Sequence, residues 1–197
     1  MLMDALARLS EWIQLILQNK YSRAGFFIIL FIVILAIGAP IIAPKHYAEV
    51  DLRNRLQPPS LQHLFGTDEL GRDVFSRVVY GARIALWVGI LVVTIEAAIG
   101  VTLGILAGYY GGKIDKVISA ITDMVWAFPP LVLALGVVTL IGPGLVNVVT
   151  AVAIVSWPTF TRIVRAKVQS LINREFVLAA RAIGESDLSI MLRYILP

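Results

Sequence analysis

The side chains that most often do chemistry are scarce or unsuitably spaced in this sequence. Cysteine is absent from the 197 residues, which excludes disulfides, thiolate metal sites and cysteine nucleophiles. His46 and His63 have no carboxylate at ligand spacing, which favours solvated or turn-forming roles over metal binding. Asp68, Glu69 and Asp73 lack the alternating ligands and central glycine of a calcium loop, so they are interpreted as caps and ion pairs. We predict no metal site and no catalytic residue.

A phosphate-binding loop is also excluded. The run from Gly111 to Lys113 contains the glycines and lysine of such a loop. The motif, however, requires glycine where Ala107 stands and serine or threonine where Ile114 stands. We therefore expect this chain to bind neither ATP nor any other cofactor.

One ionisable residue, Glu96, lies deep in an apolar segment. It precedes Gly100, Gly104 and Gly108, which repeat every four residues and so share its helix face. Such a glycine face lets another helix approach closely, so we predict a helix-packing seam. A carboxylate in mid-bilayer costs about 2.5 kcal/mol or more unless it is protonated or partnered. Glu96 either contacts a pathway through the membrane or forms a hydrogen bond within the seam, and the residues leave both roles open.

The C-terminal loop, residues 168–197, predicts a helix, a turn and a second helix outside the membrane. Asn173 can cap the first helix, Gly184 can end it and Ser186 can cap the second. The first helix carries small and apolar side chains suited to a cleft on another protein: Phe176, Ala179, Ala180 and Ile183. The alternative is a helical hairpin that lies on the lipid surface.

Composition places these groups in a membrane protein. The chain is 58% hydrophobic and 15% charged, whereas soluble domains are roughly 45 to 50% apolar. Its net charge of +4 is explained by basic cytoplasmic loops, and no basic stripe interleaved with aromatics indicates nucleic-acid binding. A membrane-embedded enzyme would need convergent polar residues in several spans, but apart from Glu96 the spans offer isolated groups: Thr94, Thr102, Asn147 and Ser156.

The hydrophobic pattern predicts an all-α, polytopic membrane protein. An amphipathic helix is expected over residues 1–23, on the bilayer surface, and one transmembrane domain over 24–197. Four spans are predicted, at about 24–43, 85–108, 116–140 and 145–164, with an external segment at 45–83. Pro129 and Pro130 should kink or locally open the third span. In the external segment, Thr67 or Asp68 could cap a helix.

Charge then orients the spans. The connection between the third and fourth spans is uncharged, whereas basic residues follow the fourth span: Arg162, Arg165, Lys167, Arg174, Arg181 and Arg193. Because Lys and Arg gather on cytoplasmic loops, we expect the C-terminal loop and the N-terminus to be cytoplasmic.

The C-terminal loop resembles the loop of bacterial ABC-importer permeases, written as Glu-Ala-Ala, three residues, Gly, nine residues, Ile, any residue, Leu-Pro. The matching residues are Ala179, Ala180, Gly184, Leu196 and Pro197. Leu178 stands where the pattern has glutamate, which leaves Glu175 as the nearby acid, and Tyr194 stands where it has isoleucine.

Further runs narrow the resemblance to the dipeptide, oligopeptide and nickel permease subfamily, and to the second permease of its pair. They are His63, Phe65 to Asp68, Gly71 to Asp73, Ser76 to Arg77, Tyr80 to Arg83 and Ala107 to Gly112. These matches and that of the C-terminal loop occur in the expected order over most of the chain.

The resemblance implies a permease subunit in the bacterial inner membrane that imports peptides, or alternatively nickel or another small solute. It implies a second permease forming a heterodimer, two cytoplasmic ATPases and an extracytoplasmic binding protein. ATPase docking would involve seven residues: Glu175, Ala179, Ala180, Gly184, Asp187, Leu196 and Pro197. Permeases of this kind have six spans, with two after the Leu-Pro, so a truncated sequence or a non-transporting fragment is the remaining alternative.

Overall fold

The computed structural model describes residues 19–197. The predicted amphipathic helix over residues 1–23 lies mostly outside this range. The described residues are helical, with one isolated antiparallel bridge between Thr67 and Asp73 and no strand among them. The all-α fold class is therefore confirmed.

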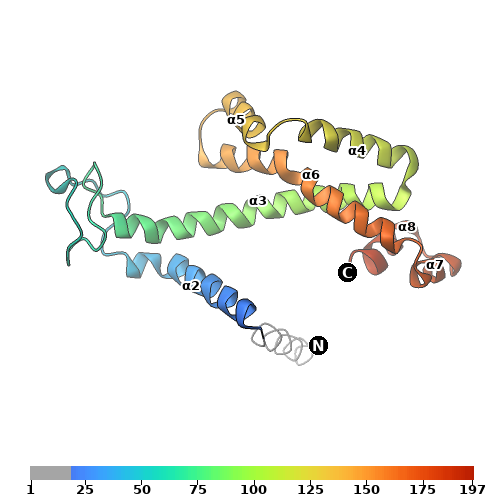
Figure 1. The fold of residues 1–197 in the computed structure, drawn as a ribbon, viewed down its shortest axis with the longest axis horizontal. Helices are drawn as coiled ribbons and strands as arrows, with labels where there is room; N and C mark the ends of the chain where they lie inside the picture. Colours follow the sequence, from blue (N-terminus) through green and yellow to red (C-terminus); the bar gives the residue numbers. More distant parts are fainter. Residues whose placement is uncertain (1–18) are drawn as a thin grey trace. The chain divides into compact units, whose positions relative to one another are not determined.

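Seven α-helices and two short turns of other helix types follow one another along the described chain (Figure 1). In order they are α2 Lys20–Ile42, η1 Leu52–Asn54, α3 Val74–Tyr110, α4 Gly112–Trp126, α5 Pro130–Ile141, α6 Leu145–Leu171, α7 Glu175–Ala182, α8 Asp187–Ile190 and the π-helical turn η2 Met191–Ile195. The chain forms two compact units, one up to Trp87 and one from Val88 to Pro197, and α3 runs from the first into the second.

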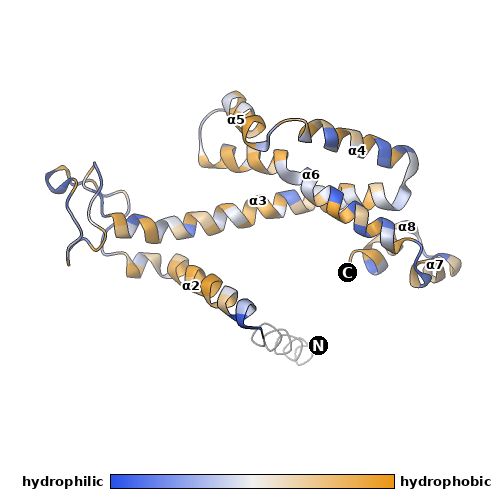
Figure 2. Ribbon diagram, viewed as in Figure 1, coloured by the Kyte–Doolittle hydropathy of each residue, from blue (hydrophilic) through white to orange (hydrophobic). Residues whose placement is uncertain are grey.

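Three of the described helices, α2, α3 and α6, are long and apolar enough to cross a membrane. Their apolar residues appear as the orange stretches of Figure 2. The chain is thus a multi-span membrane protein, with a fourth span if the bent pair α4 and α5 counts as one.

The predicted third span, 116–140, is not one kinked helix. The helices α4 and α5 meet at an angle of 86°. The cause is the proline pair: Pro129 is the N-cap of α5 and Pro130 its first residue. Neither can donate a helical hydrogen bond, and the ring of each clashes with the preceding turn, so the helix ends before them and restarts at Pro130.

The start of α3 also differs from the prediction. The helix begins at Val74 and continues without a break to Tyr110, so the expected span at 85–108 is its second part. The cap is neither Thr67 nor Asp68. The backbone N–H of Ser76 donates to Oδ2 of Asp73 at 2.7 Å, which makes Asp73 the capping residue.

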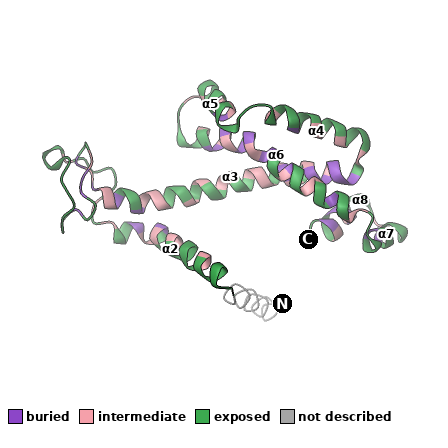
Figure 3. Cartoon of the chain, viewed as in Figure 1, coloured by how far each residue is buried: buried purple, intermediate pink, exposed green. Residues whose placement is uncertain are grey.

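The second unit has its core along α6. Burial concentrates there and at the end of α3 (Figure 3), and the buried α6 residues include Ala151, Ala153, Val155 and Val168. The helix α5 packs against α6, and the glycines of α3 allow α3 to approach α6 closely. This core positions the C-terminal loop described next.

Candidate functional site

The C-terminal loop folds as a helix, a turn and a second helix. Gly184, at φ +84°, ends α7, since the left-handed conformation suits glycine. The hydroxyl of Ser186 caps α8 by accepting from the N–H of Ser189 at 3.3 Å. Asn173 does not cap α7: the N-cap is Arg174, which makes no side-chain cap bond.

The outer face of the C-terminal loop is open. Of the seven residues predicted to dock an ATPase, six are exposed: Glu175, Ala179, Gly184, Asp187, Leu196 and Pro197. Large apolar side chains are exposed on the same segment: Phe176, Leu178, Ile183 and Leu188. The loop thus presents small and apolar groups outward, as a docking surface requires.

Two of the seven predicted docking residues contact the rest of the unit. Ala180 is only 2% exposed and belongs to the core cluster beneath the loop. Asp187 is exposed, and one of its carboxylate oxygens accepts a hydrogen bond from Tyr109, which lies in α3. The helical period of α7 explains the burial of Ala180, because Val177 and Ala180 share the face that meets the core.

That cluster fastens the C-terminal loop to both long helices of the unit. It consists of Ile105 and Tyr109 from α3, Val168 from α6, and Val177, Ala180, Ile190, Met191 and Ile195 from the loop. The loop is therefore a packed part of the unit. Its connection to α6 is direct as well, because α6 continues to Leu171.

Tyr109 is a functional candidate that the sequence prediction missed. Its hydroxyl lies 2.6 Å from Oδ1 of Asp187, in α8. The guanidinium of Arg181, in α7, lies 5.6 Å from the centre of its ring. The run from Ala107 to Gly112 held the signal, since Tyr109 and Tyr110 end an otherwise apolar helix.

The three predicted packing glycines lie against α6. A Cβ added to Gly104 would come within 2.7 Å of Cβ of Val164, and one added to Gly108 within 2.6 Å of Cβ of Val168. A Cβ on Gly100 would collide with Phe160. The helices α3 and α6 therefore touch at three successive turns where only glycine fits.

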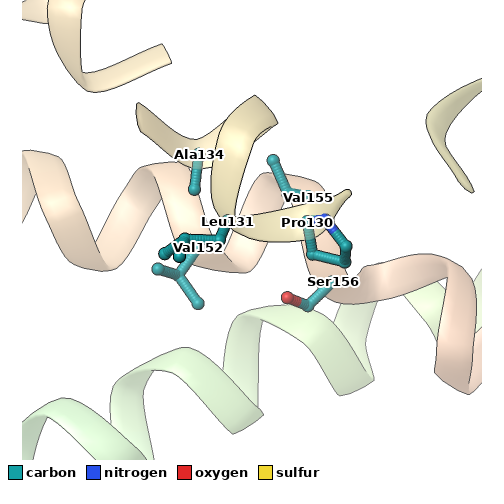
Figure 4. A pocket seen from close by; sticks show the side chains of 6 residues that line it. All are labelled: Pro130, Leu131, Ala134, Val152, Val155 and Ser156. Carbon is teal, nitrogen blue, oxygen red and sulfur yellow. The ribbon is translucent and has the colours of Figure 1, made fainter. Parts of the chain in front are cut away.

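Glu96 lies one turn before this seam and is half-buried. Its carboxyl group faces the hydroxyl of Ser156, in α6. Ser156 also borders a cavity of about 170 Å³ whose other lining residues are apolar (Figure 4): Pro130, Leu131, Ala134, Val152 and Val155. Glu96 thus has a polar partner within the helix pair, next to an apolar pocket at the start of α5.

Ion pairs join α4 to α6. Arg165 Nη2 donates to Asp115 Oδ2 at 2.7 Å, and Arg162 pairs with Asp123. The guanidinium of Arg162 also lies 3.9 Å from the ring centre of Trp126. The sequence prediction used these arginines only to orient the spans and did not foresee their partners.

The segment of residues 45–83, predicted to be external, is held by its own polar network. His63 is 6% exposed and its Nδ1 lies 3.0 Å from Oδ1 of Asp73, so a solvated role is wrong. The predicted turn-forming role is confirmed, because the carbonyl of His63 accepts from the N–H of Gly66 at 2.9 Å. His46 does form a turn, with its Nδ1 accepting from the N–H of Ala48 at 3.3 Å. Burial raises the pKa of Asp73, but the hydrogen bonds to Ser76 and His63 outweigh burial and hold this pKa below its usual range.

Asp68 organises the turn before α3. Its carboxylate accepts from the N–H groups of Leu70 and Arg72 at 2.9 and 3.0 Å, and it pairs with the side chains of Arg72 and Arg77. Burial alone would raise the pKa of Asp68, yet the hydrogen bonds from Arg72 and Leu70 and the Arg72 charge hold it at about 2. Gly71, at φ +72°, lies so close to the carbonyl of Asp51 that a Cβ would collide with it.

Two family models match the chain. Residues 100–197 match the binding-protein-dependent transport system inner membrane component, and residues 9–59 match the N-terminal transmembrane domain of oligopeptide transport permease C. Together they cover the C-terminal loop, the glycine seam and the first span.

Curated relatives agree with these models. The chain is 46% identical to the dipeptide transport system permease protein DppC of Alkalihalophilus pseudofirmus, over 98% of this chain and 65% of the relative. It is 40% identical to DppC of Bacillus subtilis, over 91% of this chain and 56% of the relative. It is 48% identical to the glutathione transport system permease protein GsiD of Escherichia coli, over 91% of this chain and 59% of the relative. The chain thus spans 56 to 65% of the length of these relatives.

Proposed function

This chain belongs to the family of inner membrane components of binding-protein-dependent transport systems, and we propose that it is a permease subunit of an ATP-driven peptide importer. In this role it forms one half of a translocation pathway and passes mechanical work from a cytoplasmic ATPase to its spans. It performs no catalysis of its own and binds no cofactor.

The observation that carries this proposal is the two-sided C-terminal loop. Its outer face exposes Glu175, Phe176, Ala179 and Gly184, while its inner face packs into the core shared by α3 and α6. A short helix with small and apolar residues fits a cleft on a partner. Because the same helix is fastened to two long helices, a displacement of the loop would move them too.

Three further partners complete the proposal. A second permease forms the other half of the pathway, two ATPase subunits supply the energy, and an extracytoplasmic binding protein delivers the cargo. The N-terminus and the C-terminal loop face the cytoplasm, in keeping with the basic residues after the fourth predicted span. The folded external segment then faces the binding protein.

We propose short peptides as the cargo. The names of the relatives specify dipeptide and glutathione transport, and both substrates are short peptides. A nickel or other small-solute importer remains the alternative for the same subfamily. Within residues 19–197 no group of three His, Cys, Asp or Glu side chains is placed to hold a metal ion, so nothing in that range favours nickel.

The ATPase contact can be tested by measuring binding of the purified ATPase to the chain in lipid nanodiscs. Ala179→Arg places a large charge on the exposed face of α7 and should weaken binding by roughly tenfold or more, the usual effect at the centre of an interface. The matched control, Ala166→Arg, adds the same side chain to an exposed position on α6. Equal affinity of the two variants would contradict docking through the loop.

A further inference from the structure

A single side chain, Tyr109, contacts both helices of the C-terminal loop. Its hydroxyl donates to the carboxylate of Asp187 at the start of α8, at 2.6 Å. Its ring lies 5.6 Å from the guanidinium of Arg181, in α7. Tyr109 itself is 7% exposed and is the second-last residue of α3. It therefore joins the end of a long helix to both halves of the predicted docking element.

The chemistry of these two contacts makes them directional. A hydroxyl-to-carboxylate bond of this length belongs to the charge-assisted class, about twice as strong as a bond between neutral groups. A guanidinium within about 6 Å of a tyrosine ring is attracted to the ring face. The surrounding apolar contacts, such as those of Val177 and Ile190, hold the loop without fixing its rotation.

The end of α3 is itself firmly placed. Gly108 precedes Tyr109, and a Cβ on it would lie 2.6 Å from Cβ of Val168 in α6. There is no free space at this point for the helix to yield. A displacement of α7 and α8 that pulls on Tyr109 must therefore move α3 rather than be absorbed locally.

We propose that Tyr109 is a positioning residue that fixes the C-terminal loop to α3, so that force applied to the outer face of the loop reaches the helix carrying Glu96. The inference that force arrives from an ATPase rests on the proposed function. The anchoring of the loop does not. Asp187, although exposed, is the acceptor for Tyr109.

The test uses the chain in lipid nanodiscs with spin labels at Val93→Cys in α3 and Ala182→Cys in α7. Because the chain has no cysteine, no native thiol competes for the label. Val93 is 51% exposed and Ala182 is exposed. In the otherwise unaltered chain, we expect one narrow distance distribution between the labels.

Tyr109→Phe keeps the ring and removes only the hydroxyl. We expect a second, longer distance to appear, because losing a bond to a charged acceptor shifts the ratio of seated to released loop by roughly tenfold or more. Asp187→Asn retains an acceptor and should have a smaller effect. The double variant should be no worse than Tyr109→Phe, since the two groups act as one pair. The matched control is Tyr110→Phe, whose residue is 46% exposed.

A second readout separates positioning from simple loss of folding. In unlabelled chains, Tyr109→Phe should bind the ATPase within about twofold of the parent, because the outer face is unchanged, whereas an unfolded loop would lose binding. An unaltered distance distribution, or a loss of binding that accompanies the longer distance, would overturn the proposal. Absence of ATPase binding by the parent chain would instead refute the proposed function, and the distance measurement would still decide the role of Tyr109.

Discussion

The glycine seam yields the most quantitative prediction, the effect of Gly104→Ala. A Cβ at this position would lie 2.7 Å from Cβ of Val164 and 2.8 Å from the carbonyl oxygen of Thr161. Both are well inside normal van der Waals separation, and the second is backbone, which cannot rotate away. The helices must therefore move apart, and overpacking of this kind costs about 1 to 3 kcal/mol.

The matched control for this prediction is Gly89→Ala in the same helix. A Cβ at Gly89 would meet nothing within 4 Å among the described residues. Replacing a helical glycine by alanine there should be neutral or stabilise the helix by up to about 1 kcal/mol. The comparison isolates the seam, because both variants add the same methyl group to α3.

The assay is reversible unfolding in mixed micelles with increasing sodium dodecyl sulfate, followed by far-ultraviolet circular dichroism. Gly104→Ala should lower the free energy of unfolding relative to Gly89→Ala by about 1 to 3 kcal/mol, the cost of the clash, because the gain in helix propensity is common to both variants. Equal stability of the two variants would refute close packing of α3 on α6.

Three further predictions follow from polar contacts. Asp68 has a pKa of about 2, against an ordinary value of 3.8. Its stabilisation of residues 45–83 is therefore fully present well above pH 3.8 and is lost as the pH falls toward 2. Asp68→Asn should abolish that part of the acid dependence when hydrogen exchange is measured in residues 45–83. Asp115→Asn should weaken the pair with Arg165 and lower the free energy of unfolding by about 1 kcal/mol. A double variant that combines Asp115→Asn and Arg165→Gln should lose a similar amount, because the two side chains act as one pair. Glu96→Gln keeps a side-chain oxygen and adds an amide group that faces Ser156. If Glu96 acts within the seam, the free energy of unfolding should change by less than about 1 kcal/mol. Unaltered peptide uptake by the assembled transporter would remove the pathway role.

The long apolar helices could be predicted from the sequence because hydrophobicity alone determines them. The uncharged run that follows Arg23 became α2, and the glycines at every fourth position faced a neighbour as their spacing required. Ser186 and Gly184 were also foreseen, since capping and left-handed turns depend on local chemistry.

What the sequence did not reveal depended on contacts between distant residues. The proline pair indicated a disturbance at Pro129, but it predicted neither the angle of 86° nor the packing of α5 on α6. Ala179 and Ala180 are alike in sequence, yet one is exposed and the other buried, because only the tertiary fold decides which face of α7 meets α3. The pairing of His63 with Asp73 was likewise hidden by a turn that brings them together.

The contact between α3 and α6 also limits how these helices can move. Glycines recur every fourth residue on one side, and the α6 residues they meet, Phe160, Val164 and Val168, recur with the same spacing. Two surfaces with a shared repeat fit together again only after a shift of one helical turn, about 5.4 Å. Smaller slides would drive side chains into backbone. Relative motion of the pair is therefore restricted to discrete steps.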